Sequence, residues 1–507
     1  MRAVQSSSSK CGSAAAAISR GRDDTLRLID LKQQEIRELQ QSGAFTGTTK
    51  DRTTADLNKL RKDANGLEQE LLEANPRYGT MLNSDVSLAQ LQEQLTSGQS
   101  YVKIFLLADR GYGMFITRAE ARPYPIDLNR ASARELATKL RTPFDQVAAT
   151  GRLARYDVDL AHKLFLKLFQ PVMPQMMATQ RLVYEPDATL VGVPVGALVV
   201  DDDSVATMKI NLQAAIKART VPNYVGVHWL GAKMESALSV STSAFVQGRK
   251  LAASKAPKPF IGFGDPVLNG DSQLFSSVGV ANGRGTAGRL AVCDAMRSQL
   301  MALKLLPDTA DEIRVVSNSL KGDSSDTVLG GAFTDSGVRK LGQSAGGLDQ
   351  YRVLYFATHG VLPPTNGCMS PALVTSLGDA TSDGLLDQNE IWDLKLDADM
   401  VVLSACDTGG SNGSGATINS GGEALGGLVR AFIYAGARNL VVSNWKVDSS
   451  ATARLMASMF QAGKGTQGEA LATAQRAMIN SPDQYSHPFF WAAFSLVGDG
   501  ERAMPQS

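Results

Sequence analysis

The sequence predicts an α/β protein built on a mostly parallel sheet that is flanked by helices. Three observations predict this class: apolar strands alternate with helical stretches beyond residue 255, a strand-rich unit precedes them, and a helical segment comes near the N-terminus. Strands that are apolar throughout are typical of parallel sheets covered on both faces. A length of 507 residues allows two or three domains.

The composition is that of an ordinary globular protein. Hydrophobic residues make up 43% and charged residues 20%, which excludes wholesale disorder. The chain has 51 Lys and Arg against 50 Asp and Glu, a balance that argues against direct binding of nucleic acid. The 4 cysteines, at positions 11, 293, 368 and 406, are too few and too scattered for a disulfide framework. We therefore expect a reduced, cytoplasmic setting.

Neither a membrane span nor a secretory signal is predicted. The longest apolar run, 188–200, contains Pro194 and is far shorter than the ~20 residues that a membrane helix needs. The first residues are Ser-rich and lack a hydrophobic stretch of the kind that secretory signals have. We expect no membrane partner.

The N-terminal part divides into two segments. Residues 1–23, rich in Ser, Ala and Arg, are predicted to be a flexible lead-in. Residues 24–80 are predicted to form a helical pair or short coiled coil, because leucines and isoleucines recur at three- and four-residue spacing on either side of a break at 43–49. The pair serves as a structural stalk or as a site for a regulatory partner.

Residues 81–254 are predicted to form an α/β half without chemistry of its own. We expect strands at 101–107, 111–117, 119–125, 182–186 and 196–200, and helices at 131–140 and 160–169. His162 and His228 have no Cys or acid at ligand spacing and are expected to be ordinary packed residues.

Residues 255–507 repeat a strand, turn and helix pattern. Strands are expected at 259–264, 313–316, 351–358, 400–405 and 439–443, and helices at 297–306, 387–394, 423–436, 449–462 and 467–479. Ligands and catalytic groups of such sheets gather at the carboxyl ends of the strands.

Two of these strands end in reactive residues. One leads into His359 and Gly360, and the other leads into Cys406 and Asp407. If the two strands are parallel neighbours, the imidazole and the thiol emerge at one edge of the sheet. A deprotonated Cys is a strong nucleophile near neutral pH, and a His can serve it as base and then as acid. The His precedes the Cys by 47 positions, close to the ~50 of the caspase pattern.

Several ordered motifs resemble the CHAT family of caspase-like cysteine peptidases, of clan CD. They are Tyr355-Phe-Ala-Thr-His-Gly, Asp383-Gly-Leu-Leu-Asp-Gln-Asn-Glu-Ile, Val402-Leu-Ser-Ala-Cys-Asp-Thr-Gly, 422–437, 442–448 and 487–499, with Gly262-Phe-Gly-Asp-Pro and 306–313. The resemblance implies a caspase-like catalytic half at 255–507 after a related half without the dyad. It also implies N-terminal TPR repeats, as in TPR-CHAT proteins, but 24–76 has room for one helical hairpin, so we expect the array to be absent or truncated.

The candidate site consists of a few residues at these strand ends. His359 and Cys406 are the predicted catalytic dyad, and the backbone N–H groups of Gly360 and Cys406 are the predicted oxyanion donors. Candidate substrate-binding residues are Ser404, Asp407 and Trp445; a packed role for Trp445 is equally compatible with the sequence. His487, before Pro488, is expected to be structural. No metal or phosphate-binding motif occurs, so no cofactor is predicted.

The function predicted from these residues is a cysteine endopeptidase acting on protein substrates, of the kind used in bacterial signalling or defence. The resemblance implies that it is latent until a partner or effector engages the N-terminal region. The alternative is a signalling scaffold whose caspase-like half is catalytically idle; the presence of both dyad residues favours the enzyme.

Overall fold

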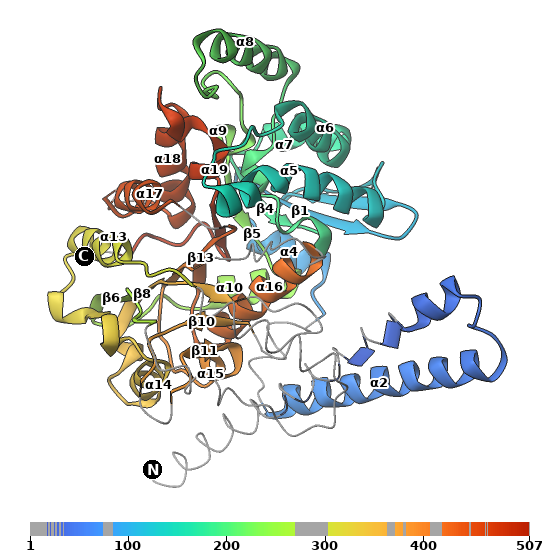
Figure 1. Ribbon diagram of the computed structural model, residues 1–507, viewed down its shortest axis with the longest axis horizontal. Coiled ribbons are helices and arrows are strands. Elements are labelled where there is room, and N and C mark those ends of the chain that lie inside the picture. The colour runs from blue at the N-terminus through green and yellow to red at the C-terminus, as the bar shows by residue number, and fades with distance from the viewer. Residues whose placement is uncertain are drawn as a thin grey trace.

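The computed structural model describes residues 35–74, 85–268, 303–361, 371–378, 382–405, 418–445, 448–461 and 465–505, with Gly463 and single residues between 18 and 33. These segments fold into a mixed α/β structure around one large sheet (Figure 1). The described chain contains the following helices: α2 (Gly47–Ala74), α4 (Leu88–Gln94), α5 (Arg130–Thr150), α6 (Val158–Phe169), α7 (Met173–Met177), α8 (Asp202–Ala218), α9 (Leu230–Lys233), α10 (Thr242–Lys250), α13 (Asp308–Ser319), α14 (Asp335–Gln343), α15 (Gln388–Trp392), α16 (Ile418–Ala435), α17 (Ser449–Gln461), α18 (Gln467–Ile479) and α19 (Pro488–Trp491).

The large sheet has eleven strands in the order β3-β2-β1-β4-β5-β14-β13-β12-β8-β6-β7. The β1–β2, β2–β3 and β13–β14 pairs are antiparallel and the other pairs are parallel. The strands are β1 (Gln99–Leu106), β2 (Gly111–Ile116), β3 (Ala121–Ile126), β4 (Arg181–Glu185), β5 (Glu235–Leu238), β6 (Lys258–Gly264), β7 (Thr327–Leu329), β8 (Tyr351–Ala357), β12 (Met400–Ser404), β13 (Asn439–Ser443) and β14 (Phe494–Val497).

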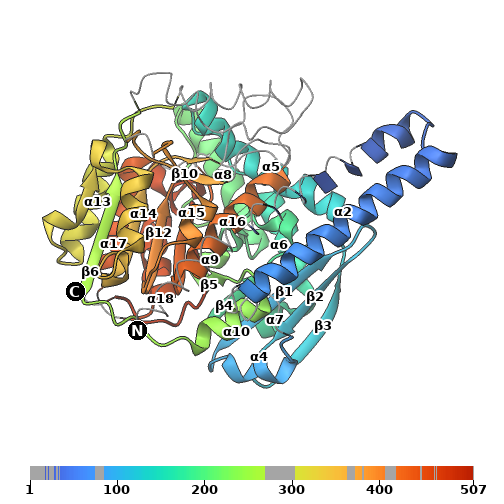
Figure 2. The ribbon, with the colours of Figure 1, turned by 90° about the horizontal axis from the view of Figure 1, so that it is seen from below.

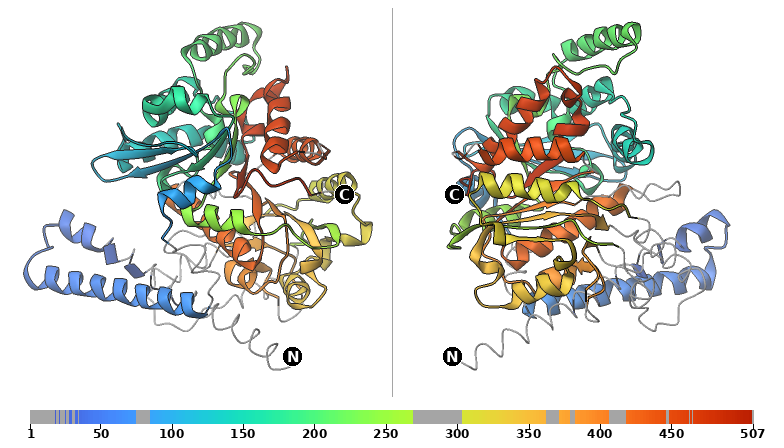
Figure 3. Two further views of the ribbon diagram at one scale, coloured as in Figure 1. Left: turned by 180° about the vertical axis from the view of Figure 1, so that it is seen from behind. Right: turned by 60° about the vertical axis from the view of Figure 1, so that its left-hand side comes forward.

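Alternation along the central strands explains why they are apolar throughout. Met400 and Val402 of β12 belong to the core on one face, whereas Val401, Leu403 and the following Ala405 belong to the core on the other. Figure 3 shows α13, α17 and α18, in yellow to red, stacked on one side of the sheet, with α16 on the opposite side. The predicted fold class, a mostly parallel sheet flanked by helices, is confirmed.

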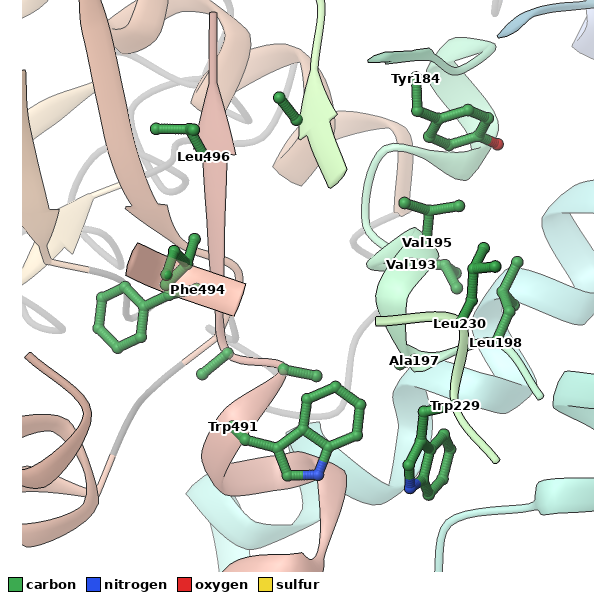
Figure 4. Packing of buried hydrophobic residues seen from close by; sticks show 14 of the residues in the cluster. Tyr184, Val193, Val195, Ala197, Leu198, Trp229, Leu230, Trp491, Phe494 and Leu496 are labelled. Atoms are coloured by element: carbon green, nitrogen blue, oxygen red, sulfur yellow. The ribbon is translucent and has the colours of Figure 1, made fainter. Parts of the chain in front are cut away.

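The parts before and after residue 255 share this sheet. Strand β14 pairs with β5 in parallel, and the Trp229 and Trp491 rings meet beside this junction with centroids 5.3 Å apart (Figure 4). They belong to one apolar cluster that extends from β1 to α18. The boundary between 81–254 and 255–507 remains a prediction.

The N-terminal helical pair is present and projects from the body of the protein (Figures 1 and 2). Helical residues continue to Gln41, a turn follows, and α2 runs back beside them, with Ile29, Leu57 and Ala64 buried in their contact. In the part of the chain that the structure describes, no helix has both the length and the apolar character that crossing a membrane requires.

Two predicted strands are wrong. Residues 313–316 lie inside α13, where Ala310, Ile313 and Ser317 are buried at helical spacing and the preceding Pro307 starts the helix. At 196–200, Val195–Ala197 form a 3-10 turn, and Val199 makes an isolated bridge to Trp229. A short apolar run has no clear period, so such segments are easily misassigned. The helix predicted at 297–306 is absent from 303–306, and 297–302 lie outside the described residues.

A second, small sheet lies beside the carboxyl end of β8. Its strand order is β11-β10-β9, all antiparallel, with β9 (Gly360–Val361), β10 (Ala372–Val374) and β11 (Leu385–Asp387). Because β9 begins directly after His359, this sheet and the large one meet at that histidine.

Candidate functional site

The segment after β8 is held on both sides by backbone hydrogen bonds. Strands β8 and β12 are parallel neighbours, with Ala357 opposite Ser404. The N–H of Thr358 donates to the carbonyl oxygen of Ser404 at 3.1 Å, and the N–H of Val374 donates to that of His359 at 2.8 Å. The hydroxyl of Thr358 also donates to the carbonyl of Val374 at 2.5 Å. His359 is therefore fixed between β12 and β10 at the carboxyl edge of the sheet.

The imidazole of His359 is buried, with the residue 4% exposed, and has a defined orientation. Its Nε2 lies 2.7 Å from the carbonyl oxygen of Lys304. A carbonyl oxygen only accepts, so Nε2 carries the proton in this contact and Nδ1 is the basic atom of the ring. A hydrogen bond that fixes the tautomer and the direction of a ring is what a catalytic base requires.

The strand that leads to the predicted nucleophile is also well fixed. Strand β12 ends at Ser404, and the hydroxyl of Ser443 in β13 donates to the carbonyl of Leu403 at 3.0 Å and accepts from the N–H of Ala405 at 3.3 Å. Cys406 and Asp407 lie outside the described residues. Gly360, the other predicted oxyanion donor, is buried at the start of β9.

Ser404 occupies a polar site beneath the strand ends. It is buried, and its hydroxyl lies beside the carboxylate of Glu312 and the phenol group of Tyr355. The phenol hydroxyl of Tyr355 donates to the same carboxylate. Burial raises the pKa of Glu312 to about 7, and the neighbouring hydroxyls of Tyr355 and Ser404 oppose that rise.

Trp445 is buried at the same edge of the sheet. Its indole N–H donates to the carbonyl of Phe489 at 2.9 Å, and its ring stacks on Phe144 of α5 at 4.1 Å. The guanidinium of Arg141 lies 5.4 Å from the ring. These contacts give Trp445 a packing role between α5 and the loop after β13.

The acidic residues of the 383–391 motif take part in local structure. Asp387 is the N-cap of α15 and forms a capping box with Glu390. Arg339 of α14 pairs with Glu390 at 3.2 Å and with Asp335 at 3.1 Å. Burial raises the pKa of Glu390 to about 8. Among the described residues, no group of His, Cys, Asp and Glu forms a metal site.

The remaining histidines are structural or surface residues. His487 is buried, accepts from the N–H of Phe489 at 3.0 Å and donates to the carbonyl of Ala154 at 2.9 Å, so the predicted structural role is confirmed. His162 is buried as expected. The expectation for His228 is wrong: its side chain is exposed and pairs with Asp201 at 2.7 Å, because it precedes Trp229, whose ring fills the core.

The sequence offered weak signals for three residues of the site. Glu312 stands among helix positions that are otherwise small or apolar on their buried side, but the strand predicted at 313–316 concealed that pattern. Tyr355 is one of several aromatic residues in an apolar strand. Lys304 contributes a backbone carbonyl, which no sequence pattern reveals.

Two curated relatives share part of the sequence. Tetratricopeptide repeat protein 28 of Homo sapiens and that of Mus musculus are each 30% identical to this chain over 115 residues. The match covers 22% of this chain and 4% of each relative, so the chain spans a small fraction of their length.

Two solved structures match the chain with low TM-scores and little sequence identity. The Arg-specific cysteine proteinase gingipain R matches with a TM-score of 0.35 at 9% identity, over 73% of this chain and 74% of that one. Separase, in a Saccharomyces cerevisiae separase–securin complex, matches with a TM-score of 0.39 at 7% identity, over 88% of this chain and 32% of that one.

A family model also matches the chain. The model of the CHAT domain matches residues 158–499, which include His359, Cys406 and the strands that carry them. The matched range is more than half of the 507 residues. The chain therefore belongs to the CHAT domain family.

Proposed function

We propose that the protein is a cysteine endopeptidase that cleaves protein substrates with His359 and Cys406. The observation that carries the proposal is the placement of His359: its ring is oriented by the Lys304 carbonyl, at the end of a strand whose parallel neighbour leads into Cys406. The CHAT family match supports the same class of activity.

The residues suggest a two-step reaction. Nδ1 of His359 takes the thiol proton, and the thiolate of Cys406 attacks the scissile carbonyl carbon. The N–H groups of Gly360 and Cys406 stabilise the oxyanion that forms. The C–N bond then breaks, and the imidazolium gives its proton to the leaving amine. Water, activated by the same ring, hydrolyses the thioester and restores the thiol.

Labelling with a thiol-reactive peptide probe tests the proposal. A peptidase is expected to react at Cys406 faster than at its other cysteines, and His359→Ala is expected to abolish that preference. Equal labelling of all cysteines in both forms would refute the peptidase and leave the idle scaffold as the better description.

A second part of the proposal concerns regulation. The pair formed by α2 and the helical residues before it projects from the body, which makes it accessible to a partner (Figure 2). We propose that the enzyme is latent until a protein or effector engages this pair.

A further inference from the structure

Glu312 is a buried ionisable group that the proposed reaction does not use. It lies in α13 with 2% of its surface exposed, and among the described residues no cation pairs with it. Helix α13 packs closely on the sheet because β6 has glycines there: a Cβ at Gly262 or Gly264 would come within 2.5 Å of the Ile313 side chain. This close approach brings the carboxylate to the underside of β8 and β12.

The carboxylate connects the two strands that carry the dyad. It accepts a hydrogen bond from Tyr355, four residues before His359, and it lies beside the hydroxyl of Ser404, two residues before Cys406. The surrounding side chains of the same face, Val353, Ala357 and Val402, are apolar. A buried carboxylate in such surroundings is costly, and a purely structural role would be served as well by an apolar side chain.

Resting on the proposed peptidase function, we infer that Glu312 is a positioning residue that holds the carboxyl ends of β8 and β12 at the spacing the His359–Cys406 pair needs. It acts through Ser404 and Tyr355 and does not touch substrate. An ionised carboxylate accepts from both hydroxyls at once. A protonated acid is itself a donor, so one of the two hydroxyls must turn away, and the bridge between the strands changes.

Other charged groups near α13 have partners of their own. Lys258 of β6 pairs with Asp326 at 2.9 Å, and Arg454 of α17 pairs with Asp483 at 3.7 Å. On β8 and β12 the groups that contact the carboxylate are Tyr355 and Ser404, and burial brings the pKa of Glu312 to about 7. The bridge therefore changes across neutral pH.

The test compares Glu312→Gln with the wild type, because Gln has the shape of the protonated acid. Two quantities are measured from pH 5.5 to 8: kcat on a cleaved peptide, and the rate at which iodoacetamide alkylates Cys406. We expect kcat of the variant to be about 10-fold lower at pH 8 with KM within about twofold, and equal to the wild type at pH 5.5. The alkylation rates are expected to diverge in the same way. Glu235→Gln, in β5, is the matched control and should follow the wild type.

The outcomes separate the two proposals. If no peptide is cleaved but the alkylation rates still diverge with pH, the peptidase fails and the role of Glu312 stands. If both forms cleave with the same pH dependence, or the variant is slower by one constant factor at every pH, the role of Glu312 is refuted and the peptidase stands.

Tyr355→Phe, which removes one hydroxyl of the bridge, serves the same comparison if Glu312→Gln does not fold. In a double-mutant cycle, Ser404→Ala is expected to add little to Glu312→Gln, and additive losses would contradict the bridge.

Discussion

The N–H of Thr358 donates to the carbonyl oxygen of Ser404 at 3.1 Å, so the pairing of β8 and β12 extends to the residue before His359 on one side and to Ser404 on the other. His359 directly follows Thr358 in the sequence, and Cys406 comes two residues after Ser404. His359 is therefore positioned by the backbone of a buried sheet, which is more rigid than a surface loop. This relationship underlies the predictions on activity.

The first prediction concerns the dyad. Cys406→Ala and His359→Ala are each expected to lower kcat/KM by several orders of magnitude, because one removes the nucleophile and the other removes its base. Thermal unfolding should show that both variants keep their fold. Cys368→Ala is the matched control and should retain activity; full activity in Cys406→Ala would refute the assignment outright.

The second prediction concerns the cost of burying Glu312. Its pKa rises from 4.5 to about 7 on folding, so the unfolded chain loses its proton at lower pH than the folded one. The contribution of protonated Glu312 to the free energy of unfolding is fully favourable below pH 4.5 and is lost as the pH rises through about 7. Between pH 5 and pH 8, Glu312→Gln should gain ~2–3 kcal/mol of unfolding free energy relative to the wild type. Denaturant titrations at the two pH values measure this, and a gap that does not change with pH would contradict it.

This second prediction is independent of the peptidase. At pH 8, Glu312→Gln is then expected to have a higher free energy of unfolding than the wild type but a lower kcat. This combination is the usual sign of a residue that serves function at a cost in stability.

The sequence was sufficient to predict the architecture of the sheet around the site. The predicted elements around the site agree with β8, β12, β13, α17 and α18 to within one residue at every end: strands at 351–358, 400–405 and 439–443, and helices at 449–462 and 467–479. These segments have strong patterns, either continuously apolar or with clear helical spacing. The strand at 351–358 also ends directly before His359, which explains why this edge of the sheet could be located.

What the sequence did not reveal depends on contacts between distant segments. The Lys304 carbonyl reaches His359 across 55 residues, and Glu312 reaches Tyr355 across 43. Helix α13 was mistaken for a strand because four consecutive residues, Ile313 to Val316, are mostly apolar. Its helical identity is decided by packing on Gly262 and Gly264, which is a tertiary effect.

The third prediction concerns His487. Burial lowers its pKa to about 3, so the folded protein keeps a neutral ring while the unfolded chain takes up a proton below pH 6.5. The contribution of neutral His487 to the free energy of unfolding is therefore fully present above pH 6.5 and is lost as the pH falls toward 3. From pH 7 to pH 5 the wild type should lose ~2 kcal/mol relative to His487→Gln. The exposed His228→Gln is the matched control, and an equal change in both variants would argue against a special role of the buried ring.

The fourth prediction concerns latency. Removing residues 1–80 deletes the projecting helical pair and none of the strands of the large sheet. If the pair receives an activating signal, the truncated and full-length proteins should differ in their response to an activator-containing extract, with the truncated form unresponsive. Peptide cleavage with and without the extract measures this. Maximal activity of both forms without any addition would contradict latency.

The last prediction concerns the substrate residue before the scissile bond. Side chains alternate along a strand, so Ser404 points to the same face as Cys406 would, and the resemblance to caspase-like peptidases implies that this position borders the primary specificity pocket. A carboxylate there would attract Arg or Lys through a charge-assisted hydrogen bond worth ~1.5–3 kcal/mol, or about one to two decades in rate.

Ser404 supplies no charge, and its hydroxyl lies beside Glu312 and Tyr355. We therefore expect an uncharged, apolar residue to be preferred before the cut, and Ser404→Asp to shift the preference toward Arg and Lys by about 10-fold or more. Profiling both enzymes with a peptide library measures the preference, and Ser404→Ala is the control for loss of the hydroxyl alone. Strict cleavage after Arg or Lys by the wild type would overturn the prediction. Glu312, whose carboxylate lies beside Ser404, would then be the first acid to replace, followed by Asp383 and Asp387.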